Sequence, residues 1–129
     1  MPKIGVTSPA DFKLFCEEVK KWQVRLGLLD WRIDFFHQNA VETVGATRGW
    51  FEARDGFVCN IGLALSWGED EVTKEKVKET ALHETLHIIL AEMCWLADQR
   101  FLPQGLLEIE EHRIIRRFET CLTALDRKG

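Results

Sequence analysis

The segment Ala81-Leu82-His83-Glu84-Thr85-Leu86-His87-Ile88-Ile89-Leu90 is the most informative stretch of this sequence of 129 residues. It contains the pattern His-Glu-x-x-His inside an apolar run that is typical of a helix packed against a core. On such a helix His83 and His87 lie one turn apart on the same face, so both imidazoles can reach one ion. Histidines and a glutamate in these surroundings would lose hydration without compensation unless they had such a partner. The pattern therefore predicts a metal site.

Zinc is the metal that this pattern favours, although iron, cobalt or nickel could use the same ligands. Neutral imidazoles bind Zn²⁺, and the ion lowers the pKa of a bound water molecule to about 7. A neighbouring carboxylate can then take a proton from that water as it attacks a carbonyl carbon. We therefore expect Zn²⁺ as the cofactor, His83 and His87 as ligands, and Glu84 as the general base.

The third ligand should come from another element, because a catalytic zinc ion usually has three protein ligands and one open position. A last helix is expected from about residue 106 to about residue 125, with an apolar stripe at positions 115, 118, 122 and 125. Glu111 extends this stripe backward, so we expect it to point inward and to be the third ligand. Glu108, one turn earlier on the same stripe, is the alternative third ligand.

Two other side chains of the last helix are weaker candidates. Glu110 lies on a different face from Glu111 and is expected to meet solvent. His112 would complete a site of three histidines and is less favoured than either glutamate on the stripe. Acids in a first turn are also favoured by the helix dipole, but the dipole does not explain why Glu111 lies on the apolar stripe.

Two helices are expected ahead of this last one. Ser8 is the expected N-cap of the first, Pro9 is its first residue, and Gly27 lies at or near its end. Residues 68–71 form a polar break. Thr73 can then cap the motif helix, which is expected to run to about residue 96.

Three strands are expected between these helices, over residues 31–36, 43–52 and 57–63. Asp55-Gly56 is a dipeptide that suits a tight hairpin between the second and third strands. We therefore expect an α+β fold. It would consist of an N-terminal helix, a small antiparallel three-stranded sheet, the motif helix and a C-terminal helix that carries the third ligand.

Length and composition limit the classes of protein that need to be considered. The 129 residues predict one domain spanning positions 1–129. A net charge of −4 offers no broad basic field for a nucleic acid. No apolar run approaches the ~18–20 residues that cross a bilayer, and the N-terminus lacks the apolar segment of a signal peptide. We therefore expect a cytoplasmic protein with neither a nucleic acid nor a membrane as partner.

The cysteines agree with a reducing compartment. They are far apart and include no Cys-x-x-Cys pair, which favours reduced thiols over a disulfide framework or a four-thiolate zinc site. The residues concerned are Cys16, Cys59, Cys94 and Cys121.

The motif at positions 83–87, followed by an inward glutamate on a later helix, resembles the gluzincin branch of the zincin metallopeptidases. The order of helix, strands, motif helix and ligand helix is similar to a minimal zincin core. Small proteins of this kind include the SprT-like and ImmA/IrrE-type metallopeptidases of bacteria and phages. Residues 111–118 resemble their third-ligand helix. The chain has neither a Cys₄ ribbon nor an appended DNA-binding region, so no single subfamily is assigned.

The resemblance implies a hydrolase, specifically a zinc metallopeptidase (protease) that acts on a peptide or protein substrate. His83, His87 and Glu111 would hold zinc, and Glu84 would be the general base for hydrolysis of a peptide bond. The strand over residues 57–63 could bind an extended peptide at the sheet edge. Two alternatives remain open: a zincin-fold binding or regulatory module with little or no activity, and a metal-dependent hydrolase of a non-peptide bond.

The group that would stabilise the oxyanion is not evident from the sequence. Many zincins use a tyrosine or a histidine together with the metal, and this chain contains no tyrosine. Four side chains are candidates to replace it: His37, Arg48, His112 and Arg113.

Overall fold

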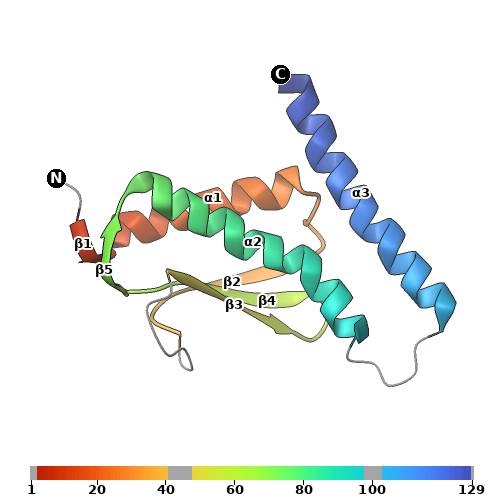
Figure 1. The fold of residues 1–129 in the computed structure, drawn as a ribbon, viewed down its shortest axis with the longest axis horizontal. Coiled ribbons are helices and arrows are strands. Elements are labelled where there is room, and N and C mark those ends of the chain that lie inside the picture. Colours follow the sequence, from red (N-terminus) through yellow and green to blue (C-terminus); the bar gives the residue numbers. More distant parts are fainter. Residues whose placement is uncertain (1–2, 41–47, 98–102, 129) are drawn as a thin grey trace.

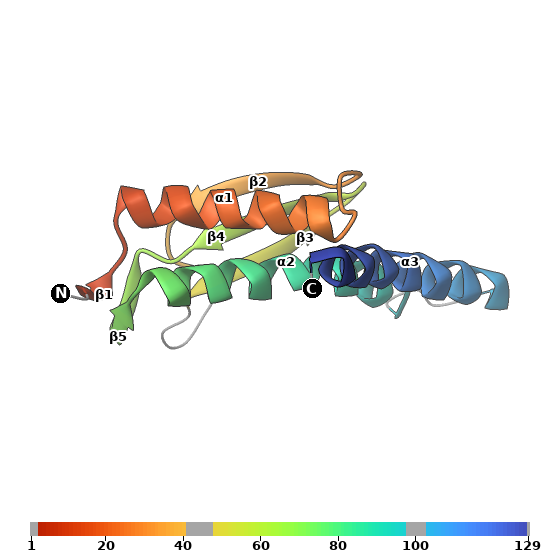
Figure 2. The same cartoon turned by 90° about the horizontal axis from the view of Figure 1, so that it is seen from above.

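The structure, a computed structural model, describes residues 3–40, 48–97 and 103–128. This part of the chain is α+β, with three helices and two small sheets. The elements in chain order are β1 (Lys3–Val6), α1 (Pro9–Arg25), β2 (Arg32–His37), β3 (Gly49–Arg54), β4 (Val58–Leu63), β5 (Ser66–Val72), α2 (Lys74–Ala97) and α3 (Gln104–Lys128). Figures 1 and 2 show α1 and α2 side by side on one face of the sheet formed by β2, β4 and β3.

The first two helices begin where the capping residues predict. The backbone N–H of Asp11 donates to Ser8 Oγ (3.2 Å), and the Ser8 N–H donates to Asp11 Oδ2 (2.8 Å), which completes a capping box. At the start of α2 the Lys76 N–H donates to Thr73 Oγ1 (3.1 Å). Because these caps satisfy N–H groups that have no partner inside the helix, they fix the start of each helix.

The three-stranded sheet is mixed, so the expectation of a fully antiparallel sheet is wrong. The strand order is β2-β4-β3, with β2 parallel and β3 antiparallel to β4. The expected hairpin between β3 and β4 is confirmed, and Gly56 takes the positive φ of 76° that its turn requires. Residues 43–47, the first part of the expected second strand, lie outside the described residues.

A second, two-stranded sheet pairs the first strand of the chain with the strand that precedes α2. β1 and β5 are antiparallel, and Lys3 lies opposite Val72 in the register. Residues 68–71, expected to be a polar break, therefore lie inside a strand. Their polar side chains hide the strand pattern, which is visible only in the buried residues near its ends, Trp67 and Val72.

The core lies between the sheet and the first two helices. Alternate side chains of β4 point into it, as expected for a strand with one face on the core. Full burial of each large apolar side chain contributes about 1.5–3 kcal/mol. The core residues from these elements include Phe15 and Val19 of α1, Cys59, Ile61 and Leu63 of β4, and Val77, Ile88 and Ile89 of α2.

Two further observations bear on the expectations from composition. The four cysteines are free, as predicted, and none is paired in a disulfide. Within the described ranges, no helix has both the length and the apolar character needed to cross a membrane.

The last helix presents a different face to the body from the one expected. Its apolar side chains are exposed at Ile115 (42 %) and Phe118 (46 %). Arg117 is buried instead, and its Nη1 donates to the Gly27 carbonyl oxygen (2.5 Å). The prediction of an inward apolar stripe is therefore wrong, because α3 docks through a buried arginine. In Figure 1 the C-terminal end of α3 stands clear of α1 and α2.

Candidate metal centre

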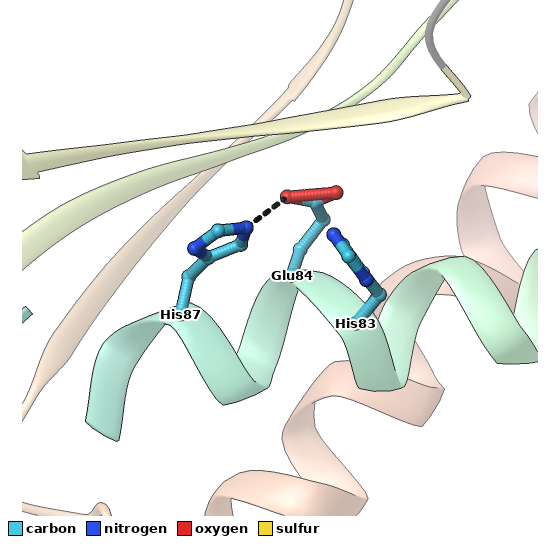
Figure 3. A group of neighbouring side chains, drawn as sticks. All are labelled: His83, Glu84 and His87. Atoms are coloured by element: carbon cyan, nitrogen blue, oxygen red, sulfur yellow. Dashed lines mark ion pairs between the residues drawn. The ribbon is translucent and has the colours of Figure 1, made fainter. Parts of the chain in front are cut away.

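Three side chains of the motif come together on α2. Figure 3 shows that His83, Glu84 and His87 project from the same side of the helix, toward the strands of the sheet. The two imidazole rings are T-shaped with centroids 5.1 Å apart, and His87 Nε2 lies 4.0 Å from Glu84 Oε1. The helical spacing of the motif alone brings these three side chains together, as the sequence predicts.

The donor set suits zinc. Two imidazole nitrogens and one carboxylate oxygen lie within 4.8 Å of one another. Two nitrogens bound to one zinc ion at about 2.0–2.1 Å each can be up to about 4 Å apart. A small rotation of the side chains would therefore let both imidazoles bind the same ion. The residues present fit Zn²⁺, and its binding stays a prediction.

Glu84 occupies the inner position of the group. Its side chain is only 6 % exposed, and this burial raises its pKa to about 7, because desolvation penalises the charged carboxylate. A Cβ atom added to Gly49 would lie 3.3 Å from Glu84 Cγ and 2.7 Å from Thr80 Cγ2. The absence of a side chain at Gly49 therefore lets the start of β3 pass directly over this carboxylate.

His87 is held by the next inward residue of the same strand. The rings of Phe51 and His87 are stacked, with centroids 5.5 Å apart and an angle of 10° between their planes. Burial lowers the pKa of His87, and the neighbouring His83 lowers it further. A lowered pKa keeps the imidazole neutral near pH 7, which is the form that binds a metal ion.

A cavity of about 380 Å³ opens beside the motif. Its lining residues are Arg48, Gly49, Glu79, Thr80, His83 and Glu84. Arg48 is thus the member of the four oxyanion candidates that shares a cavity with the motif. Sequence reasoning gave it no priority over the others, because the closeness of β3 to α2 at Gly49 is a tertiary feature.

The other three oxyanion candidates have partners elsewhere. His37 Nε2 lies 2.7 Å from Thr7 Oγ1 and its ring stacks on Phe12. His112 Nδ1 lies 2.8 Å from the carbonyl oxygen of Glu108. The guanidinium of Arg113 lies over the ring of Phe57.

The predicted third ligands do not join the motif in this structure. Glu111 and Glu108 are exposed on α3, and His112 is exposed as well. Among the residues described, only His83, Glu84 and His87 form a group of three or more such side chains whose donor atoms converge. The expected inward position of Glu111 is therefore wrong, and its role as a ligand remains a hypothesis.

The prediction for Glu110 is wrong in the opposite direction. It was expected in solvent, but its side chain is 13 % exposed and belongs to the face of α3 that meets α2. Burial raises the pKa of Glu110, and the nearby carboxylate of Glu92 raises it further. The apolar stripe identifies neither the docked face of α3 nor its buried acid.

No protein-family model, curated protein sequence or solved structure matches this chain. The chemistry of the site is therefore inferred from the side chains that α2 and β3 bring together.

Proposed function

We propose that the protein is a zinc-dependent metallopeptidase with a minimal zincin-like core. One observation carries the proposal: His83, Glu84 and His87 converge on one side of α2, beneath β3 and beside a cavity. His83 and His87 would hold the ion, and Glu84 would act as the general base. The proposed substrate is a peptide or protein, and the proposed compartment is the cytoplasm.

The chemistry divides between the ion and Glu84. A bound zinc ion supplies Lewis-acid polarisation of a carbonyl group and makes water more acidic. Glu84 takes one proton from the attacking water and delivers it to the nitrogen of the leaving amine. A bond forms between the water oxygen and the carbonyl carbon, the C–N bond breaks, and the second proton stays with the new carboxyl group.

An extended peptide would be bound by β3 rather than by the strand expected from the sequence. β4, which covers all but the first residue of the expected strand 57–63, is paired on both sides and has no free edge. β3 is an outer strand of the sheet within the described part of the chain, and its inward residues Gly49 and Phe51 lie against Glu84 and His87. A peptide that adds to this edge would therefore run along the motif.

A binding or regulatory module with little or no activity is the second candidate. The observation that favours it is that, among the described residues, α3 contributes no donor atom to the group formed by His83, Glu84 and His87. The module and the peptidase both predict zinc binding, and they differ in hydrolysis.

Substitution of Glu84 by glutamine tests the proposed function. The wild-type protein should bind one zinc ion per chain and cleave members of a peptide library detected by mass spectrometry. Glu84→Gln should retain zinc and lose cleavage. Glu75→Gln is the matched control, because it removes an exposed acid from the first turn of the same helix. Cleavage that survives Glu84→Gln overturns the assignment of the base.

Assays on other classes of substrate distinguish the peptidase from the two alternative functions. Hydrolysis of an ester or phosphoester panel without any peptide cleavage would identify the non-peptide hydrolase. Zinc binding without hydrolysis in either panel would favour the binding module.

A further inference from the structure

Arg48 is held at both its backbone and its side chain. Its carbonyl oxygen accepts hydrogen bonds from Trp67 Nε1 (3.0 Å) and from the backbone N–H of Ala64 (2.9 Å). Its guanidinium lies over the ring of Trp67, 5.6 Å from the centroid, and Trp67 is only 1 % exposed. The indole therefore supports Arg48 from below and limits the positions that the guanidinium can take.

An acidic partner fixes the direction of this guanidinium. Arg48 Nε donates to Asp70 Oδ2 (2.6 Å), and Lys76 Nζ donates to Asp70 Oδ1 (2.9 Å). The hydrogen bonds from Lys76 and Arg48 hold the pKa of Asp70 below its usual value, so Asp70 stays ionised near pH 7. Asp70 therefore orients Arg48 under the conditions in which Glu84 would act.

The Nη atoms of Arg48 carry N–H donors that have no hydrogen-bond partner among the described residues. An arginine side chain carries five N–H donors. Nη1 lies 3.9 Å from Glu79, a distance too long for a hydrogen bond, and Nη2 has no hydrogen-bond partner among the described residues. Arg48 lines the same cavity as His83 and Glu84. The cavity thus contains an oriented cation beside the proposed base, in a chain without tyrosine.

We propose that Arg48 is a catalytic residue that donates hydrogen bonds to the carbonyl oxygen of the scissile peptide bond as negative charge develops on that oxygen. This inference rests on the proposed peptidase function. As the water oxygen bonds to the carbonyl carbon, the electron pair of the C=O π bond moves onto the carbonyl oxygen, where the Nη donors of Arg48 stabilise it. The pair returns to the C–O bond as the C–N bond breaks and the amine leaves with the proton from Glu84.

The position of Arg48 favours an oxyanion over a terminal carboxylate as its ligand. Gly49, the next residue, begins β3, and a Cβ atom added to it would lie 3.3 Å from Glu84 Cγ, so Arg48 directly precedes the residue that passes closest to the proposed base. A carboxylate at the end of a peptide needs a cation displaced along the cleft from the reacting carbon. The oxyanion and the terminal carboxylate are both anionic oxygens. Peptides with different C-terminal ends distinguish which of them Arg48 binds.

Three variants test the role of Arg48 on peptides that the wild-type protein cleaves, each made with a C-terminal amide and with a free carboxylate. Arg48→Gln should lower kcat by about 10²–10³-fold with little change in KM, equally for both peptide ends. Arg48→Lys keeps the charge without the planar fork and should lie between wild type and Arg48→Gln. Arg32→Gln, which removes an exposed arginine from β2 on the opposite side of β4 from β3, should match wild type.

A binding measurement supplies a second readout that does not depend on turnover. The probe is a phosphonamidate dipeptide, in which an anionic tetrahedral phosphorus group replaces the scissile carbonyl. Calorimetry on zinc-loaded protein should show affinity reduced by about 10²-fold or more in Arg48→Gln, with zinc content and the urea midpoint at wild-type values.

The outcomes separate this inference from the proposed function. If kcat is unchanged in Arg48→Gln, or if only KM rises and only for free-carboxylate peptides, the oxyanion role is overturned while Glu84-dependent cleavage still supports the peptidase. If the wild-type protein cleaves no peptide, the proposed function fails. Equal phosphonamidate affinity in wild type and Arg48→Gln overturns the role of Arg48 in either case.

Discussion

Arg117 of α3 and Glu92 of α2 form an ion pair that is buried at both ends. Nη2 lies 2.5 Å from Glu92 Oε1, and the two side chains are 7 % and 3 % exposed. Glu92 Oε1 also accepts a hydrogen bond from Trp31 Nε1 (3.1 Å), while Arg117 Nη2 donates to Asp30 as well (3.0 Å). The last helix is thus attached by a charged network that also includes the residues leading into β2.

Loss of Arg117 should destabilise the protein strongly. Arg117→Met leaves the carboxylate of Glu92 buried without its cation, and removal of one partner from a buried pair costs about 3–5 kcal/mol. The measurement is the free energy of unfolding in urea. Arg116→Met is the matched control, because Arg116 is exposed on the same helix, and its effect should stay within about 0.5 kcal/mol. Equal effects of the two substitutions would contradict the burial of this pair.

The stability of the zinc-free protein should fall as the pH rises through the titration range of Glu84. Its pKa is about 7 in the folded protein, against 4.5 for the ordinary side chain. The folded state therefore binds this proton more tightly than the unfolded state does. The resulting stabilisation is complete below about pH 4.5 and is lost by about pH 7, with a total of about 3 kcal/mol.

A comparison with Glu84→Gln isolates this effect. At pH 8 in the presence of a chelator, the variant should unfold at a higher urea concentration than wild type, because glutamine removes the buried charge. At pH 5 the difference between the two proteins should be much smaller. A difference that does not change with pH would show that Glu84 titrates normally.

A methyl group at position 49 should disturb the contact between β3 and α2. In Gly49→Ala the new Cβ would lie 2.7 Å from Thr80 Cγ2 and 3.0 Å from the Gly62 carbonyl oxygen. Relief of this overlap must move the strand from the helix, at a cost of about 1–3 kcal/mol in the free energy of unfolding. Gly105→Ala is the control, since its Cβ would meet nothing within 4 Å, and an alanine at this helix start should not lower the free energy of unfolding. A neutral Gly49→Ala would refute the close approach.

Metal content should depend on the histidines of α2 and not on the acids of α3. His83→Ala and His87→Ala should each lose zinc after dialysis, as measured by atomic emission. Glu108→Ala and Glu111→Ala should retain it, because both side chains are exposed and outside the converging group. If Glu111→Ala lost zinc while Glu108→Ala retained it, α3 would have to reach the histidines in solution, as the sequence-based assignment requires.

Local patterns in the sequence predict the local features well. Ser8, Thr73 and the Asp55-Gly56 turn each occur where the structure places a helix start or a hairpin, because a cap or turn depends on residues within a few positions. The convergence of the three motif side chains is predictable for the same reason, since the turn of the helix alone brings them together.

Features that depend on distant residues were not predictable. The parallel pairing of β2 with β4 depends on where the chain re-enters the sheet, and β5 is a strand because β1 pairs with it. The orientation of α3 is set by Glu92 and Asp30, which attract Arg117. Amphipathicity identifies the apolar face of a helix, but the docked face is decided by the partner.

The close approach of β3 to α2 at Gly49 has a consequence for what could be digested at this edge. A helix is about 10–12 Å wide and already pairs its own backbone groups, so it can offer no hydrogen bonds to a strand. Only an unfolded segment, such as a frayed end or a damaged loop, presents unpaired backbone N–H and C=O groups. A protease built on this edge would discriminate by the conformational state of its target before any side chain was read.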